Sequence, residues 1–326
     1  MNTRLYRPSD ANLRKLADIL CDGNLVAVPT ETVYGLAADA MNPSACQKIF
    51  AAKNRPNEDP LIIHVSNVGQ AMELAHWNET ADKLADAFWP GPLTMVLRKK
   101  TVVSDLITAG LDSVALRIPW HPVFRSLLKI TDKPLAAPSA NPFGYISPTT
   151  SRHVMDSLQG KIPAILEGGP CDIGVESSII DLRDDRNPQL LRPGGVPAKT
   201  LNDALECPTR KLLGNTPSNE AAIAPGLLDR HYSPRTKVCL HDEFPKLKSP
   251  NEAWVFFASP SDPRPNQVNF FVLSPDGKSA SAARRLYALL RSADAKNFKR
   301  INVERAPKDE QWAEAINDRL RRAAAS

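Results

Sequence analysis

Cysteine and histidine are sparse in this 326-residue chain, and neither has the spacing of a metal or redox site. The five cysteines form no C-x-x-C pair. Their odd number predicts reduced, mostly buried thiols rather than disulfides or metal ligands. The six histidines show no H-x-x-x-H or H-x-H spacing, which argues against a zinc site. We therefore expect no metal centre built from the protein's own side chains.

Long apolar runs are also missing. No stretch approaches the roughly 18 apolar residues that a membrane helix requires. The first ten residues are polar and lack the apolar core of a signal peptide. We expect a soluble cytoplasmic protein that has no membrane partner.

The chain has little charge imbalance and few aromatic residues. Its net charge is +5, its isoelectric point is near 8.9, and aromatic residues make up 6%. This mild basicity permits an RNA or nucleotide partner, although a solvated surface with a slight lysine and arginine excess explains it equally well. The absence of an arginine-rich tract argues modestly against an RNA-binding protein.

The common nucleotide-binding and hydrolase motifs are absent. The nearest match to the P-loop pattern G-x-x-x-x-G-K-[ST] ends at Gly277-Lys278-Ser279, but Val272 stands where its first glycine should be. No G-x-G-x-x-G and no G-x-S-x-G occur. Any nucleotide must therefore bind through a different kind of site.

Strand and helix patterns alternate along most of the chain, which predicts an α/β fold. In the first part, strands are expected at 25–28, 61–65, 94–97, 114–118, 135–137, 164–167, 178–182 and 189–191. Helices are expected at 9–23, 43–52, 70–76, 80–88, 122–129 and 150–158. Because strands outnumber helices, we expect a twisted mixed sheet flanked by helices rather than a purely parallel one.

Composition changes after residue 195, which predicts a second unit. Residues 207–235 have many prolines, glycines and polar residues with little periodicity, as in a linker or functional loop. A smaller α/β unit follows, with strands expected at 238–240, 253–257, 270–273 and 301–304 and helices at 281–293 and 311–324. We predict a larger α/β domain at 1–205, a linker or lid at 206–236 and a C-terminal α/β (Rossmann-like) domain at 237–326.

The most informative segment is the polar stretch from Pro29 to Ala38, which follows the apolar run at 25–28. It carries two threonines, Glu31 and Tyr34 before Gly35. A fold does not need so much polar chemistry in one strand-to-turn segment, so we expect a site for an anionic ligand here.

Two further fragments share this character. Lys53-x-Arg55 places two cations at a predicted helix end, where they could bind a phosphate chain or only complement the helix dipole. Ser139-x-Asn141 follows an apolar strand. Its side chains could contact a ligand, although a simple turn is the favoured interpretation of that fragment alone.

Two charged or titratable residues interrupt apolar strands. Arg117 lies within 114–118 and needs a partner, which could be a ligand carboxylate or a protein Asp or Glu. His64 lies within 61–65, where a satisfied core histidine is the commoner case. Further along, Ser177 and Ser178 lead into another strand, and Arg192 supplies another cation at a strand end.

Taken in order, seven segments resemble the threonylcarbamoyl-AMP synthase family, whose catalytic part is the YrdC-like domain. The segments are PTETVYGLAADA, KNRPNEDPLIIHV, FWPGPLTMVL, VALRIPWHP, PLAAPSANPFGYISPTT, GVESSIIDL and LLRPGGV. APGLLDRHYSP resembles the linker of the longer two-domain branch, and VERAP with AINDRLRRAA resembles the end of its C-terminal domain.

The resemblance implies that L-threonine, bicarbonate and ATP with Mg²⁺ give threonylcarbamoyl-AMP and pyrophosphate. The product would pass to tRNA threonylcarbamoyltransferase proteins, which modify the adenosine next to the anticodon. The implied threonine-side residues are Thr32, His64, Arg117, Ser139 and Ser177. The implied ATP-side residues are Lys53, Arg55, Asp59, Ser113, Asn141, Ser147, Thr149, Arg192 and Tyr232.

The implied mechanism relies on positioning and electrostatics rather than on a protein nucleophile. Lys53 and Arg55, with Mg²⁺, would neutralise charge at the phosphates, and the linker near Tyr232 could cover the site. Asp59, where the family usually has asparagine, departs from the pattern, and so do Ser113 for threonine and Ala224 for serine. For the synthase, we expect at most weak RNA binding. The alternative is an RNA-binding or ribosome-assembly factor that uses the same domain, which would bind RNA tightly and in a salt-dependent way without ATP.

Overall fold

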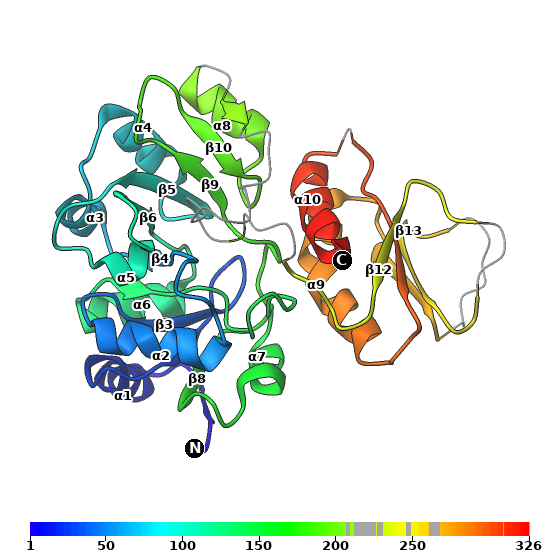
Figure 1. Ribbon diagram of the computed structural model, residues 1–326, viewed down its shortest axis with the longest axis horizontal. Helices are drawn as coiled ribbons and strands as arrows, with labels where there is room; N and C mark the ends of the chain where they lie inside the picture. The colour runs from blue at the N-terminus through cyan, green and yellow to red at the C-terminus, as the bar shows by residue number, and fades with distance from the viewer. Residues whose placement is uncertain are drawn as a thin grey trace.

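The computed structural model of the protein describes residues 1–206, 209–211, 226, 231–245, 249–260, 268–308 and 310–325. These residues form a larger and a smaller body that lie side by side (Figure 1). Most of the predicted linker or lid at 206–236, including Ala224, lies outside the described residues.

The larger body contains a mixed sheet, as predicted, with eleven described strands instead of the eight expected from the sequence. Their order in the sheet is β1-β8-β2-β3-β7-β4-β6-β5-β9-β10-β11. The sheet contains parallel pairs, such as β4/β6 and β5/β9, and antiparallel pairs, such as β3/β7 and β5/β6. The strands are β1 Arg4–Tyr6, β2 Val26–Val28, β3 Gly35–Asp39, β4 Ile62–His64, β5 Leu93–Arg98, β6 Ser113–Arg117, β7 Leu135–Ala136, β8 Ala164–Leu166, β9 Ser178–Asp181, β10 Gln189–Arg192 and β11 Arg210–Lys211.

Local sequence signals explain where the helices of this body begin. Ser9 and Asn42 cap α1 and α2 by accepting hydrogen bonds from backbone N–H groups, and Pro43 occupies the first turn of α2. Asn67 and Asn78 cap α3 and α4 in the same way. The helices are α1 Asp10–Cys21, α2 Pro43–Lys53, α3 Val68–Leu74, α4 Glu79–Phe88, α5 Asp105–Thr108, α6 Pro122–Thr131, α7 Ser151–Leu158 and α8 Ala198–Leu205.

Both faces of the sheet are buried. Along β2, Val26 and Val28 belong to one core cluster and Ala27 belongs to another, as the alternation of side chains in a strand requires. The polar segment 29–34 follows β2 directly. The fold thus places that segment where a strand leaves the buried sheet.

The smaller body is a parallel sheet with the order β12-β15-β13-β14. Its elements are β12 Val238–His241, β13 Ala253–Ala258, β14 Phe270–Ser274, α9 Ser279–Asp294, β15 Ile301–Glu304 and α10 Ala313–Ala324. Helices α9 and α10 lie on the side of this sheet that faces the larger body (Figure 1).

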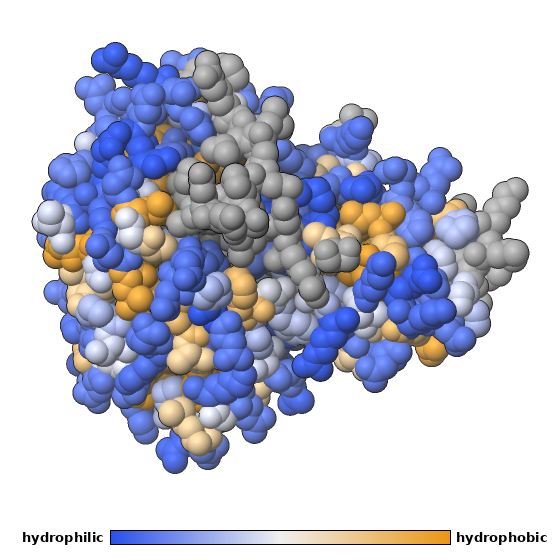
Figure 2. All heavy atoms as spheres, in the orientation of Figure 1, coloured by the Kyte–Doolittle hydropathy of each residue, from blue (hydrophilic) through white to orange (hydrophobic). Residues whose placement is uncertain are grey.

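The two bodies share apolar packing. Val33, Ile146 and Val175 of the larger body belong to the same core cluster as Tyr287 of α9 and Ile316 of α10. On the face shown in Figure 2, hydrophilic residues cover most of the described surface of both bodies. Among the described residues, no helix is long and apolar enough to cross a membrane.

Candidate functional site

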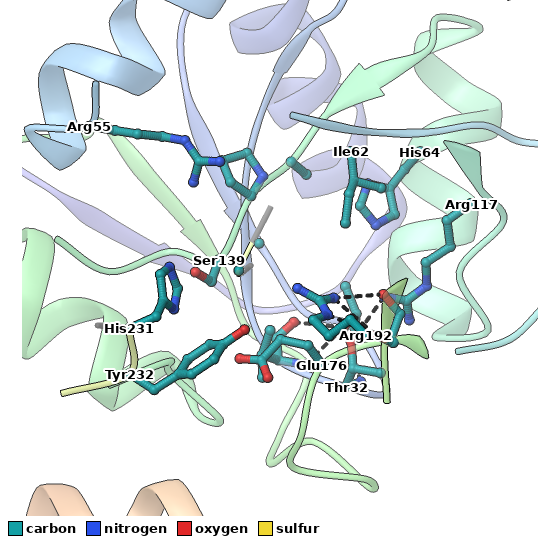
Figure 3. Close-up of a pocket in the computed structure, with 17 residues that line it drawn as sticks. Thr32, Arg55, Ile62, His64, Arg117, Ser139, Glu176, Arg192, His231 and Tyr232 are labelled. Carbon is teal, nitrogen blue, oxygen red and sulfur yellow. Dashed lines mark hydrogen bonds between the residues drawn. The ribbon is translucent and has the colours of Figure 1, made fainter. Parts of the chain in front are cut away.

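A cavity lies where the predicted segments converge. Figure 3 shows His64, Arg117 and Thr32 on one side of it and Arg55, His231 and Tyr232 on the other. Eight predicted site residues line the cavity: Thr32, Arg55, His64, Arg117, Ser139, Ser177, Arg192 and Tyr232.

In the polar segment after β2, some hydroxyl groups stabilise the local backbone and others line the cavity. Thr30 Oγ1 accepts hydrogen bonds from the backbone N–H groups of Thr32 and Val33, both at 3.1 Å, and donates to the Val33 carbonyl at 2.6 Å. Thr30 therefore closes a local turn. The Tyr34 hydroxyl donates to the Gly169 carbonyl at 2.8 Å, away from the cavity lining. Thr32 is the hydroxyl of this segment best placed to meet a ligand.

Arg117 has a carboxylate partner within the protein. Its Nη2 lies 2.6 Å from Glu31 Oε1, and both side chains are buried. Its Nη1 donates to Thr32 Oγ1 at 3.0 Å, and its Nε donates to the Gly91 carbonyl at 3.1 Å. These three contacts fix the guanidinium at the cavity wall and orient the Thr32 hydroxyl.

His64 is the neutral group beside this cation. Burial, followed by repulsion from Arg117, lowers the pKa of His64 well below its usual value. Its Nδ1 has no hydrogen-bond partner among the described residues. A neutral imidazole with an unused nitrogen suits a small polar ligand.

Lys53 lies behind the loop that carries Ser139. As the last residue of α2, it donates through Nζ to the carbonyls of Ser139 and Asn141, both at 2.5 Å. It does not line the cavity. Burial, followed by repulsion from Arg55, lowers the pKa of Lys53 well below its usual value. In this structure Lys53 therefore supports the loop, and a direct ligand contact stays a prediction.

Arg55 reaches the cavity and is held from behind by Asp59. Its Nη2 lies 2.9 Å from Asp59 Oδ2 and donates to the Pro60 carbonyl at 2.7 Å. The aspartate that departs from the family pattern thus pairs with a buried arginine. Burial, more than the attraction of Arg55, controls the pKa of Asp59 and raises it.

Ser177 and Arg192 form a third part of the wall. Arg192 Nη2 donates to the Ser177 carbonyl at 3.0 Å and to its Oγ at 3.2 Å, and Thr94 Oγ1 lies 2.8 Å from the same hydroxyl. Ser178 instead donates to the Val196 carbonyl at 2.5 Å. Ser177 lines the cavity, whereas Ser178 holds two backbone segments together.

Three described residues from the predicted linker complete the cavity: Gly226, His231 and Tyr232. Gly226 has a φ of 79°, in the left-handed region that favours glycine, and a Cβ there would lie 2.5 Å from Tyr232 Oη and 2.9 Å from Arg192 Nη1. The Tyr232 hydroxyl has no hydrogen-bond partner among the described residues. Burial, then repulsion from Arg55, lowers the pKa of His231 well below its usual value.

Six predicted site residues are buried but do not line this cavity: Lys53, Asp59, Ser113, Asn141, Ser147 and Thr149. Asn141 Nδ2 donates to the carbonyls of Pro142 and Tyr145, both at 2.9 Å, and Ser147 donates to Glu176 at 2.6 Å. Thr149 lies beside His153. Their ligand contacts stay predictions.

Sequence reasoning missed three polar lining residues, Thr30, Glu176 and His231, and several apolar ones. Glu176 and His231 stand directly beside the predicted residues Ser177 and Tyr232, and Thr30 lies two residues before Thr32, so proximity in the sequence was the available signal. No group of three or more His, Cys, Asp or Glu in the described part of the chain could hold a metal ion.

Two family models together match most of the chain. The model of the Sua5, YciO and YrdC proteins, described as telomere recombination, matches residues 18–194. The model described as the C-terminal domain of threonylcarbamoyl-AMP synthase matches residues 196–325. The fold and the site thus define a two-domain protein with a YrdC-like pocket.

The chain belongs to the threonylcarbamoyl-AMP synthase family. It is 45% identical over 241 residues to the enzyme of that name from Pyrococcus abyssi, covering 71% of this chain and 68% of that protein. It is 41% identical to the Bacillus subtilis enzyme over 240 residues, covering 73% and 69%. The crystal structure of P. abyssi Sua5 complexed with L-threonine matches with a TM-score of 0.90 and 37% identity over 99% of this chain and 98% of that one. These relatives do not favour the RNA-binding alternative.

Proposed function

We propose that this protein is a nucleotidyltransferase that makes threonylcarbamoyl-AMP and pyrophosphate from L-threonine, bicarbonate and ATP. The observation that carries the proposal is a single cavity with two different sides. One side has the Arg117–Thr32 pair with neutral His64, and the other has Arg55 and Tyr232, with Arg192 between them (Figure 3).

The first side suits the amino acid. Arg117 would bind the threonine carboxylate, because a guanidinium forms strong charge-assisted hydrogen bonds with carboxylates. Thr32, Ser139 and Ser177 offer hydroxyls for polar atoms of threonine. Neutral His64 can accept a hydrogen bond from its amine or hydroxyl.

The second side suits the nucleotide. Arg55 and Arg192 face the cavity and would neutralise the triphosphate, with Mg²⁺ entering as part of the ATP substrate. Asp59, Ser113, Asn141, Ser147, Thr149 and Tyr232 are proposed to bind or support the nucleotide. Lys53 would act through the loop at 139–141. An anion bound beside Arg55 would favour the charged form of Lys53.

The reaction needs no protein nucleophile. The threonine amine adds to the carbon of bicarbonate, water leaves, and a carbamate forms. A carbamate oxygen then attacks the α-phosphorus of ATP, the bond to the β-phosphate oxygen breaks, and pyrophosphate departs with the electron pair. The protein positions the reactants and stabilises the charge that develops on the phosphates.

The product is a mixed anhydride and needs a prompt acceptor. We propose that it reaches tRNA threonylcarbamoyltransferase proteins in the cytoplasm, and that contact with RNA is weak. The name of the matched relatives, threonylcarbamoyl-AMP synthase, supports the identity of the product.

Substrate omission tests the proposal. Pyrophosphate release is measured with ATP and Mg²⁺ while threonine or bicarbonate is left out. We expect release only when both are present. Release that does not depend on threonine would disprove the proposed reaction.

A further inference from the structure

Glu176 is a buried carboxylate that lines the cavity and is bound from both bodies. Ser147 Oγ donates to its Oε1 at 2.6 Å. From the smaller body, Tyr287 Oη donates to Oε2 at 2.8 Å and Arg319 Nε donates to the same oxygen at 2.7 Å. One carboxylate therefore connects a loop of the larger body to both α9 and α10.

The packing around these contacts is tight. A Cβ on Gly174, two residues before Glu176, would lie 2.5 Å from the Cα of Arg284 in α9. Arg319 is fully buried, and its guanidinium carbon lies 5.2 Å from the centre of the Tyr232 ring. The Tyr287 ring stacks on the Tyr232 ring at 5.7 Å. The residues that hold Glu176 thus also hold Tyr232.

A carboxylate is an unexpected group beside an anionic nucleotide. Burial opposes its ionisation, but Arg319 and Arg192, with the hydrogen bonds from Ser147 and Arg319, outweigh burial and lower the pKa of Glu176. Ionised Glu176 would repel a triphosphate, and its oxygens are already engaged by protein donors. Neither property suits a group that binds ATP or transfers a proton.

We propose that Glu176 is a positioning residue through which α9 and α10 hold the nucleotide side of the cavity in place. Glu176 fixes Ser147 directly, while its partners Tyr287 and Arg319 fix the ring of Tyr232. The C-terminal unit then acts on ATP binding without contacting ATP. This inference rests on the proposed function, because it assumes that ATP binds on that side.

The first test is Glu176→Gln, because two explanations predict opposite signs. If only electrostatics mattered, removing a negative charge beside the triphosphate would tighten ATP binding. Positioning predicts a KM for ATP raised by about tenfold, with the KM for threonine changed less than twofold. An unchanged or lower KM for ATP in a variant with wild-type Tm would overturn the proposal.

A matched pair of tyrosine variants separates positioning from general contact between the bodies. Tyr287→Phe removes the hydroxyl that donates to Glu176. Tyr145→Phe removes a hydroxyl that donates to Asp294 of α9 at 2.9 Å, so it breaks the same kind of bond between the bodies. We expect Tyr287→Phe to raise the KM for ATP severalfold and Tyr145→Phe to leave it unchanged. Equal effects in both variants would overturn the proposal.

Direct binding measurements separate this inference from the proposed reaction. The Kd for ATP with Mg²⁺ is measured by calorimetry on the full-length variants without threonine. If the wild type binds ATP but releases no pyrophosphate, the proposed reaction fails while the Glu176 test still proceeds on Kd. If the Kd of Glu176→Gln equals that of the wild type, the positioning role fails.

Discussion

At the scale of residues, the Glu31–Arg117 pair shows what fixes the side of the cavity that we propose for threonine. The Arg117 guanidinium is already paired within the protein. Glu31 Oε1 lies 2.6 Å from Arg117 Nη2, and both side chains are buried. An unpaired guanidinium in that position would carry a large desolvation cost before any substrate arrives. Glu31 therefore stabilises the site in the absence of ligand.

We expect Glu31→Gln to destabilise the folded protein by about 3–5 kcal/mol, because it leaves a buried charge without its partner. Urea unfolding measures this loss. L-threonine should raise the Tm of the variant more than that of the wild type, because its carboxylate partly replaces the missing charge. Asp156→Asn is the control, since it breaks an exposed ion pair with Arg152 and should change stability by less than about 1 kcal/mol. A loss no greater than the control's would contradict this role of Glu31.

The sequence could predict which residue types gather at the site but not how they pair. Thr32, Arg117 and Arg192 were predicted and do line the cavity. The partner of Arg117 stayed open, because Glu31 and Arg117 are 86 residues apart and meet only through the order of strands in the sheet. The contacts of Lys53 could not be predicted for a different reason. Its Nζ donates to backbone carbonyls, and because every residue has a carbonyl, the sequence does not mark these partners.

At the scale of elements, a glycine sets how closely one loop approaches the cavity wall. A Cβ on Gly194 would lie 2.3 Å from the Glu176 carbonyl oxygen and 2.5 Å from the Ser177 carbonyl carbon. These are backbone atoms, so they cannot move aside as a flexible side chain would. The loop that follows β10 therefore packs directly against the segment that carries Glu176 and Ser177.

We expect Gly194→Ala to displace that wall, lowering kcat/KM at least about tenfold and reducing stability by about 1–3 kcal/mol. Steady-state kinetics and thermal unfolding measure the two effects. Gly69→Ala is the control, because a Cβ there meets only Asn67 Oδ1 at 3.1 Å and the residue lies in α3. Wild-type kinetics in Gly194→Ala would contradict the close approach.

Most elements were predictable because caps and apolar periodicity mark them, as Ser9 and Asn42 do for α1 and α2. The structure adds five short elements that the patterns did not indicate: β1, β3, α5, α8 and β11. In β3, the small residues of Gly35–Asp39 have little intrinsic strand preference. Pairing with β2 and β7 makes this segment a strand, and that information is not local.

At the scale of the whole molecule, the cavity concentrates buried histidines among cations. The pKa values of His64 and His231 are both held well below their usual range, first by burial and then by nearby arginines. Both imidazoles therefore stay neutral in the folded protein at pH values where they would take up protons in the unfolded chain.

These lowered pKa values make the folded protein less stable as the pH falls, because the unfolded chain binds more protons. The neutral imidazoles of His64 and His231 contribute their full stability above pH 6.5, the usual histidine pKa. This contribution is lost as the pH falls from 6.5 towards the lowered pKa values of the folded protein. The loss is about 1.4 kcal/mol per pH unit for each imidazole. The Tm of the wild type should be lower at pH 5.5 than at pH 7.5. The difference should be smaller for His231→Gln. His76→Asn, at an exposed position, is the control. An equal fall in His231→Gln and the wild type would contradict this explanation.

The two bodies pack against each other beside the cavity. Val33 and Tyr232, which line the cavity, belong to the same core cluster as residues of α9 and α10. The sequence indicated two units and a segment between them. It could not indicate that Arg319, near the C-terminus, reaches a carboxylate at the cavity wall 143 residues away. Such a contact depends on how the bodies dock rather than on any local pattern.

Isotope labelling of the product is the most direct test of the proposed reaction. The protein is incubated with ATP, Mg²⁺, ¹⁵N-labelled threonine and ¹³C-labelled bicarbonate, and the products are analysed by mass spectrometry. We predict one AMP-containing product that carries both labels, formed in a one-to-one ratio with pyrophosphate. Pyrophosphate release with no doubly labelled adenylate would contradict the assignment of threonine and ATP to one cavity.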